Sequence, residues 1–229
     1  MSDVDNKYEY EILPEECAEN DLSFKIIIIG DAAVGKSSLT LNAVHNKFLD
    51  CYTPTIGFEF STLNIRVNDK YIKLQIWDTC GQEAYRSLIN SFYRNSSLAM
   101  IVYAINDEKS YKNIEVWLNE IRTIVGLEAK VYLIGNKSDL ENDRRVKRED
   151  AEKFSEEHDF DYFIETSAKN GVNTKNVFIQ AAIDLYKKNL DYERSKNTSR
   201  NPSGSQIEKN YKIKIENDSD MPRKKKCFC

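Results

Sequence analysis

This chain of 229 residues lacks several features that would assign it to other classes of protein. No apolar run approaches the roughly 18 residues of a membrane-spanning helix. Residues 1–5 are acidic and do not form the apolar stretch of a signal peptide. Five cysteines show no pairing pattern, and two of them stand at positions 227 and 229. We therefore expect a protein that is made and folded in the reducing cytosol.

The chain also lacks a strong excess of positive charge, since its net charge is −4. Residues 1–21 carry eight acidic residues and one lysine, whereas residues 190–229 carry ten basic and six acidic residues. A nearly neutral middle with a basic tail does not favour nucleic acid as a partner. It suits a tail that meets an anionic surface.

Composition and periodicity divide the chain into three parts. Residues 1–21 are acidic and show little periodicity, which predicts a flexible extension. Strand and helix patterns alternate over residues 22–190 and predict one α/β domain with a mostly parallel sheet. Residues 191–229 are polar and include a basic cluster, so they predict a flexible tail.

Two patterns in the middle part give more detail. Apolar and polar residues alternate on both sides of Asn68-Asp69, which predicts an antiparallel hairpin at a sheet edge. Ser110 is the expected cap of a helix whose apolar residues, Trp117 among them, fall on one face. We interpret that face as core and not as a binding surface.

The most informative motif is a G-x-x-x-x-G-K-[ST] phosphate-binding loop, which follows a buried strand at residues 24–29 and precedes a helical pattern. Gly30 and Gly35 let backbone N–H groups point at a polyphosphate, and the helix presents its positive end to it. Lys36 reaches the β- and γ-phosphates, and the Ser37 hydroxyl is a ligand for Mg²⁺. The predicted phosphate-binding residues are Asp31, Ala32, Ala33, Val34, Gly35, Lys36, Ser37 and Ser38.

Two further segments predict a guanine pocket at the same edge of the sheet. Asn136-Lys137-Ser138-Asp139 follows a buried strand, so it lies at the strand's carboxyl end, where ligands bind in open α/β sheets. The Asp139 carboxylate accepts hydrogen bonds from N1–H and the amino group of guanine, whereas adenine leaves it unpaired. Ser167-Ala168-Lys169 follows another short strand and closes the other side of the base.

A third strand, at residues 73–77, delivers Asp78 to this edge. An acidic side chain there is suited to hold Mg²⁺, through water. The N–H of Gly81 approaches a γ-phosphate, and Gln82 orients a water molecule for in-line attack. We therefore predict Lys36, Gly81 and Gln82 as the residues that carry phosphoryl transfer to water.

Taken together, five motifs resemble those of the Ras-like small GTPases, over residues 22–190. In chain order they are GDAAVGKSS, YTPTIG, WDTCGQE, GNKSD and ETSAK. Within that group the chain is similar to the Rab proteins, through IGFEF at 56–60, KLQIW at 73–77 and FYR at 92–94. The resemblance implies a six-stranded, mostly parallel sheet with one antiparallel edge strand and helices on both faces.

The resemblance also implies roles that the motifs alone did not provide. Thr55 binds Mg²⁺ through its hydroxyl and meets the γ-phosphate only in the GTP state, which makes Ser37, Thr55 and Asp78 the expected metal set. Phe48 packs against the guanine, and Tyr52 covers the phosphates. The protein is then expected to bind GTP or GDP with Mg²⁺, hydrolyse GTP slowly and direct vesicle traffic.

The partners implied are an exchange factor, a GTPase-activating protein, effectors of the GTP state, a GDP dissociation inhibitor and an escort protein. Rab proteins with a Cys-x-Cys pair are typically geranylgeranylated on both cysteines, here Cys227 and Cys229, which follow four basic residues. Two lipid chains with a basic patch anchor a protein stably. We expect the cytosolic face of an endomembrane, with an inhibitor-bound pool in the cytosol.

Four residues depart from the family's pattern. Cys80 replaces an alanine, Ala104 replaces an aspartate, and Ala32 and Ala33 stand where smaller or polar residues are usual. Three alternatives remain open at this point: a binding module that does not hydrolyse GTP, a P-loop kinase and a soluble transport GTPase like Ran. Thr55 with Gln82 argues against the first, Asp139 against the second, and the cysteine pair against the third.

Overall fold

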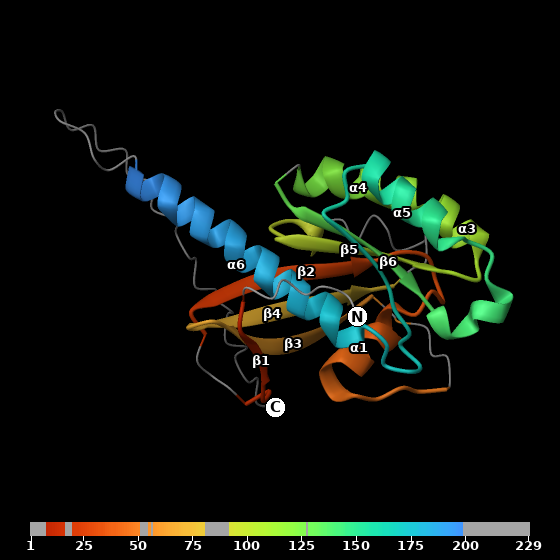
Figure 1. Cartoon of the computed structure of the whole chain (residues 1–229), viewed down its shortest axis with the longest axis horizontal. Coiled ribbons are helices and arrows are strands. Elements are labelled where there is room, and N and C mark those ends of the chain that lie inside the picture. Colours follow the sequence, from red (N-terminus) through yellow and green to blue (C-terminus); the bar gives the residue numbers. More distant parts are fainter. Residues whose placement is uncertain are drawn as a thin grey trace, which may run out of the picture. The chain divides into compact units, whose positions relative to one another are not determined.

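The computed structural model describes residues 8–16, 20–50, 55, 57–80, 92–126 and 128–198. The chain divides into two units, residues 1–191 and 192–229, and the fold below is that of the first. Its single sheet has the strand order β1-β3-β4-β2-β5-β6-β7 (Figure 1). In chain order the strands and helices are β1 (Tyr10–Leu13), β2 (Leu22–Ile29), α1 (Lys36–His45), β3 (Phe58–Val67), β4 (Lys70–Thr79), β5 (Leu98–Ala104), α3 (Glu108–Lys112), α4 (Ile114–Val125), β6 (Lys130–Asn136), the 3₁₀ helix η2 (Ser138–Asp143), α5 (Arg148–Glu157), β7 (Tyr162–Glu165) and α6 (Thr174–Thr198).

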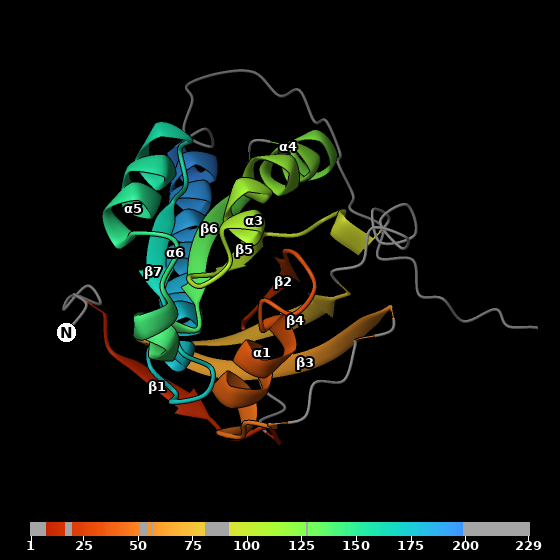
Figure 2. The same ribbon diagram turned by 90° about the vertical axis from the view of Figure 1, so that its right-hand side faces the viewer.

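The central strands are buried on both faces, as parallel strands in an α/β sheet are. Ile26 and Ile28 of β2 lie in one core cluster, together with apolar residues of α1 and α6. Ile27 and Ile29 lie in the other, together with residues of α4 and α5. Because side chains alternate along a strand, each apolar run packs against two helical layers at once. Figures 1 and 2 show α3, α4 and α5 together, away from α1.

Parallel pairing brings the carboxyl ends of five strands to one edge. Strand β2 pairs in parallel with β4 and β5, β5 with β6, and β6 with β7. The register places Ile28 beside Asp78, Ala104 beside Asn136 and Gly135 beside Glu165. The predicted hairpin around Asn68-Asp69 is present as β3 and β4, which pair antiparallel along their whole length.

The N-terminal part differs from the sequence prediction, which was a flexible extension over residues 1–21. Residues Tyr10–Leu13 instead form β1, which pairs antiparallel with Asn64–Val67 and makes the sheet seven-stranded instead of six-stranded (Figure 2). The guanidinium of Arg66 binds Glu11 at 2.9 Å, and the ring of Tyr8 packs edge-on against Tyr186. Since β1 is antiparallel to β3, only β3 runs against the other six strands, but it is no longer the edge strand.

The expected helix cap at Ser110 is wrong. The helix is split into α3 and α4, and the cap of α3 is Asp107, whose side chain accepts from the N–H of Lys109. The Ser110 hydroxyl is buried, where it donates to the carbonyl of Asp107 at 2.8 Å and accepts from the N–H of Ala104 at 3.1 Å. Its role is to join the end of β5 to α3. The predicted core face of α4 is confirmed, because Ile114, Trp117, Leu118 and Ile121 are buried and Val125 is partly buried.

Candidate functional site

The loop between β2 and α1 is built around two glycines that no other residue can replace. Gly30 has φ +138°, and a Cβ there would lie 2.1 Å from the carbonyl oxygen of Val102. Gly35 has φ +97°, and a Cβ there would lie 2.4 Å from Nδ2 of Asn136. Both positions favour glycine by conformation and by space. The loop therefore lies tightly on β5 and β6, with the amino end of α1 directed at its centre.

Lys36 is the first residue of α1, and its side chain folds back into the loop. Its ammonium donates to the carbonyl oxygens of Gly30 at 2.9 Å and Asp31 at 2.8 Å, and the residue is 5% exposed. Burial lowers the pKa of this lysine below its usual value, while the carboxylates of Asp78 and Asp31 act in the opposite direction. A cation with two backbone acceptors in a desolvated loop has capacity left for an anion.

The three residues expected to bind Mg²⁺ lie together. The Ser37 hydroxyl lies 2.9 Å from the Thr55 hydroxyl and also hydrogen-bonds Oδ2 of Asp78. Burial raises the pKa of Asp78 to about 6, although the bond from Ser37 and the charge of Lys36 lower it. Among the described residues its Oδ1 is buried with no partner. Two hydroxyls and an under-satisfied carboxylate are hard oxygen donors, which fit Mg²⁺ completed by water and phosphate oxygens.

Asn136, at the end of β6, joins the phosphate loop to the predicted base-binding segments. Its Nδ2 donates to the carbonyl of Val34 at 2.9 Å, and its Oδ1 accepts from the hydroxyl of Thr166 at 3.1 Å and the N–H of Ala168 at 3.3 Å. Its side chain thus uses both ends within the fold and keeps three segments in register.

Asp139 and Ser167 meet directly beyond this junction. The Ser167 hydroxyl donates to Oδ1 of Asp139 at 2.5 Å and accepts from the N–H of Asn170 at 3.1 Å. Asp139 is half-buried, and its Oδ2 has capacity for a donor from a base. Lys137 has φ +67°, and burial lowers the pKa of its ammonium. The segments that the sequence assigned to a base are therefore next to each other.

The remaining predicted residues fall into three groups. Val34 and Ala168 are buried, while Ala32, Ala33 and Lys169 are exposed; Ser38 is partly buried in α1. Phe48 is partly buried and packs against the core cluster that contains α1 and α6. Three residues that were expected to act on the phosphates lie outside the described residues: Tyr52, Gly81 and Gln82. The two cysteines expected to carry lipid, Cys227 and Cys229, also lie outside them.

Two residues that the sequence analysis did not assign to the site contact the phosphate loop. Nδ2 of Asn113 donates to Oδ2 of Asp31 at 2.6 Å, and the indole N–H of Trp117 donates to Oδ1 at 2.9 Å. The Asp31 side chain therefore points to α4, while its carbonyl holds Lys36. A buried tryptophan needs an acceptor for its N–H, and that requirement is the signal by which Trp117 could have been found.

Near the site, four aromatic side chains form a cluster that is exposed in part. Phe58, Trp77 and Phe92 lie within 5.9 Å of one another by ring centroids, and Phe60 lies 5.2 Å from Trp77. Phe58 is 40% and Phe60 51% exposed. The Lys25 ammonium lies 5.0 Å from the centre of the Trp77 ring. We call these four residues the aromatic cluster.

The arrangement can therefore bind a polyphosphate, a divalent cation and a planar base in a row along one sheet edge. Comparison with known proteins agrees. The model of the Ras family matches residues 25–187. The chain is 42% identical over 167 residues to the Ras-related protein Rab11B of Nicotiana tabacum, covering 73% of this chain and 76% of that one. It is 40% identical over 191 residues to the Ras-related protein RABA4b of Arabidopsis thaliana, covering 82% and 85%.

Proposed function

Because the chain belongs to the Ras family of small GTPases, and within it to the Rab group, we propose that the site described above binds GTP or GDP with Mg²⁺. As a Rab-family GTPase, the protein hydrolyses GTP and acts in vesicle trafficking. The observation that carries the site assignment is the position of Asn136. Its side chain bonds the phosphate loop on one side and the Thr166–Ala168 segment on the other. The residues proposed to bind the phosphates and those proposed to bind the base are therefore connected through Asn136.

In this proposal the chain contributes charge and position. Lys36 and the backbone N–H groups of the phosphate loop stabilise the charge that develops on the phosphates. Ser37, Thr55 and Asp78 would hold Mg²⁺, which when bound would supply positive charge that offsets the negative charge of the phosphates. Gln82 orients the attacking water, and the N–H of Gly81 meets the γ-phosphate. Tyr52 covers the phosphates, and Phe48 packs against the base.

The switch rests on Thr55 and Gly81, which gain contacts only when a γ-phosphate is present. Exchange factors, activating proteins, the dissociation inhibitor and effectors are the partners that the family uses. The aromatic cluster is our candidate for the effector surface, because large exposed aromatic side chains are costly in water and mark protein contacts.

Base selection is the decisive test of the site. We expect Asp139→Asn to lose GDP and GTP and to gain xanthosine nucleotides, which present an acceptor where guanine presents its amino group. The matched control is Asp143→Asn, an exposed residue at the other end of the same short helix. The measurement is competition of unlabelled nucleotides against a fluorescent GDP. Unchanged GDP binding in Asp139→Asn would mean that the base lies elsewhere.

Hydrolysis separates the proposed enzyme from a binding module that only holds nucleotide. We expect single-turnover hydrolysis of GTP at a slow intrinsic rate, and a further loss in Gln82→Leu at unchanged GTP affinity. A protein that binds GTP but shows no turnover, alone or with an activating protein, would favour the binding module.

Membrane attachment is proposed to run through lipid on Cys227 and Cys229. Within the residues that the structure describes, no helix is both long and apolar enough to cross a bilayer. One lipid chain gives marginal binding, and residues 223–226 add roughly 1 kcal/mol each near an anionic leaflet. We expect Cys229→Ser to bind membranes in a salt-sensitive way and Cys227→Ser/Cys229→Ser to be soluble in membrane fractionation. A double variant that still sediments with membranes contradicts this anchor.

A further inference from the structure

Arg144 lies between the two segments that read the base, and it contacts both. Its guanidinium donates to Oε1 of Glu165 at 2.7 Å and Oε2 at 2.9 Å. It also donates to Oε1 of Glu141 at 2.9 Å and Oε2 at 2.7 Å, and to the carbonyl of Val146 at 2.9 Å. One planar cation therefore makes two bidentate pairs, which only arginine can do.

The two carboxylates differ in burial, and the difference shows where the constraint acts. The side chain of Glu165 is 8% exposed and that of Arg144 16% exposed, whereas Glu141 is 65% exposed. Because a desolvated bidentate pair is much more rigid than one in water, Arg144 is fixed to Glu165 first. Glu141 is then drawn to the free side of the guanidinium.

Both glutamates that Arg144 binds are close in sequence to residues predicted to bind the base. Glu165 ends β7, two residues before Ser167, and its carbonyl accepts from Nδ2 of Asn173 at 2.8 Å. Glu141 lies in η2, two residues after Asp139. Arg144 therefore connects the helix that carries Asp139 to the strand that leads to Ser167, and the side chains of these two residues meet at 2.5 Å.

We propose that Arg144 is a positioning residue for guanine recognition, setting the place of the Asp139 carboxylate relative to Ser167. The inference rests on the proposed function, because it concerns the same base pocket. A carboxylate that accepts two hydrogen bonds from one base edge tolerates little displacement. When the bridge is lost, Asp139 still attracts a base, but it no longer meets N1–H and the amino group together.

Inosine nucleotides separate this role from a general contribution to folding. Inosine lacks the amino group of guanine, so the ratio of GDP to IDP affinity measures the contact of Asp139 with that group. A purely structural defect weakens both nucleotides equally and leaves the ratio unchanged. Loss of positioning weakens GDP more and brings the ratio towards one.

The test uses the full chain loaded with nucleotide, and it compares Arg144→Gln and Arg144→Lys with wild type. We expect Arg144→Gln to lower the GDP to IDP ratio by about tenfold, the lower end of the cost of losing an outer partner of a ligand-binding group. Arg144→Lys keeps the charge but not the two bidentate pairs, so its ratio falls by a smaller factor. Glu141→Gln removes only the exposed arm and folds even if Arg144→Gln does not; we expect a decrease of about twofold.

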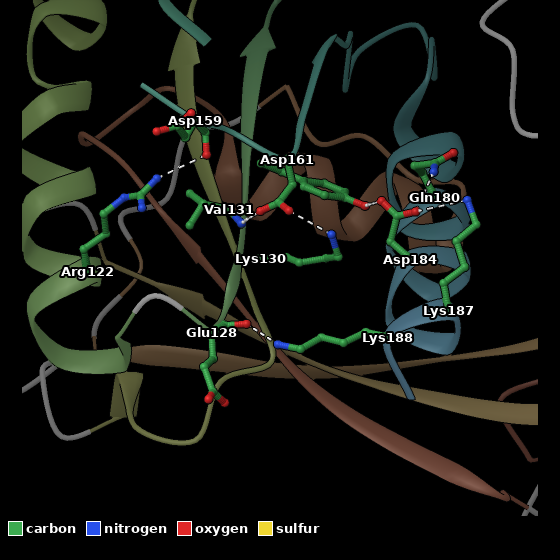
Figure 3. A network of polar contacts seen from close by, with 11 residues as sticks. Arg122, Glu128, Lys130, Val131, Asp159, Asp161, Gln180, Asp184, Lys187 and Lys188 are labelled. Carbon is green, nitrogen blue, oxygen red and sulfur yellow. Dashed lines mark hydrogen bonds and ion pairs between the residues drawn. The ribbon is translucent and has the colours of Figure 1, made fainter. Parts of the chain in front are cut away.

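Arg122→Gln is the matched control. This arginine donates to the carbonyls of His158 and Asp159 at 3.1 Å, at the other end of the sheet (Figure 3). Its loss is expected to leave the ratio at the wild-type value. If the Arg144 variants keep the wild-type ratio, or lose GDP and IDP equally, the positioning role is wrong. If wild type itself does not prefer GDP over IDP, the assignment of Asp139 to the base fails instead.

Discussion

Charged side chains at the two ends of the parallel strands differ in how completely they are hydrogen-bonded. At the amino end of β6, Asp161 accepts from the Lys130 ammonium and from the N–H of Val131, both at 2.8 Å (Figure 3). Asp184 accepts from the Tyr132 hydroxyl at 2.6 Å and from Gln180 at 3.1 Å, and it lies 3.6 Å from the ammonium of Lys187. Each carboxylate there has donors for both oxygens.

At the carboxyl end, by contrast, two charged side chains near the phosphate loop, those of Lys36 and Asp78, are incompletely paired, although Arg144 and Glu165 are paired there. The buried Lys36 ammonium has backbone carbonyls as its hydrogen-bond partners, and burial lowers its pKa. One oxygen of Asp78 has no partner among the described residues, and its pKa is raised to about 6. Incompletely paired buried charge costs stability, so an anion and a cation that bind here, as proposed, would stabilise the folded protein. The contrast supports the proposed position of the nucleotide site without reference to any relative.

Replacing a lysine by methionine should give the largest effects at the carboxyl end. There, nucleotide binding and the stability of the nucleotide-free protein should change in opposite directions. We expect Lys36→Met to weaken GDP binding by about 3 kcal/mol or more, because a buried phosphate would lose its cation. The same change should raise the stability of the nucleotide-free protein by about 1 kcal/mol, since a desolvated charge is removed. GDP titration and urea unfolding in EDTA measure the two. Lys130→Met is the control, and it should stabilise nothing and leave GDP binding intact.

Removing a satisfied carboxylate at the amino end should affect stability alone. Asp184→Asn replaces a charged acceptor of the Tyr132 hydroxyl by a neutral amide, and we expect a loss of about 2 kcal/mol in unfolding free energy. The GDP dissociation rate should stay at the wild-type value. A faster dissociation with unchanged urea midpoint would show that the two ends are coupled, and the contrast drawn above would not hold.

The chain's two tryptophans offer a smaller and sharper test. The indole N–H of Trp117 bonds Asp31 in the phosphate loop, whereas that of Trp77 is buried without a partner among the described residues. We expect Trp117→Phe to speed GDP dissociation about fivefold, equivalent to the roughly 1 kcal/mol of one hydrogen bond. Trp77→Phe should leave dissociation unchanged. Equal effects from both would mean that ring volume, and not the bond to Asp31, matters.

The smallest expected effect concerns backbone strain in the phosphate loop. Ala33 has φ +62°, a left-handed conformation that costs a residue with a Cβ roughly 1–2 kcal/mol, whereas Ala32 does not have a positive φ. We expect Ala33→Gly to be neutral or to stabilise by less than about 1 kcal/mol, because the flexibility of glycine in the unfolded chain offsets the gain. Ala32→Gly should destabilise slightly. The two melting temperatures, measured with GDP bound, compare them directly.

Features that arise from residues close together in the sequence could be predicted, whereas contacts between residues of separate elements could not. The buried strands follow from apolar runs and the Ras-like fold from ordered motifs. Asp78, Asn136 and Asp139 lie at one edge of the sheet because parallel strands end there. The bonds from Trp117 to Asp31 and from Arg144 to Glu165 were not predicted. Each joins residues from separate elements, and nothing in a local pattern encodes such a pair.

The strand β1 was missed for the same reason. Its four residues carry a weak local signal, and Tyr10 and Glu11 are exposed. Its strand conformation comes from the partner residues Asn64–Val67, more than fifty positions along the chain. The acidic composition predicted a flexible extension, but pairing at a sheet edge needs backbone hydrogen bonds more than buried apolar area.

This short strand also restricts how another molecule can extend the sheet. It occupies the backbone donors and acceptors of Asn64–Val67. Within the part of the chain that the structure describes, no strand pairs with the outer edge of Phe58–Leu63, a length of about 20 Å. That stretch begins three residues after Thr55 and carries Phe58 and Phe60. A strand of another molecule that pairs with β3 therefore cannot use Asn64–Val67, which are remote from the phosphate loop. It has to align with Phe58–Leu63, which are beside that loop. Because an unpaired strand edge is prone to aggregation, the pairing with β1 shortens the exposed edge of β3, among the described residues, to the stretch beside the proposed nucleotide site.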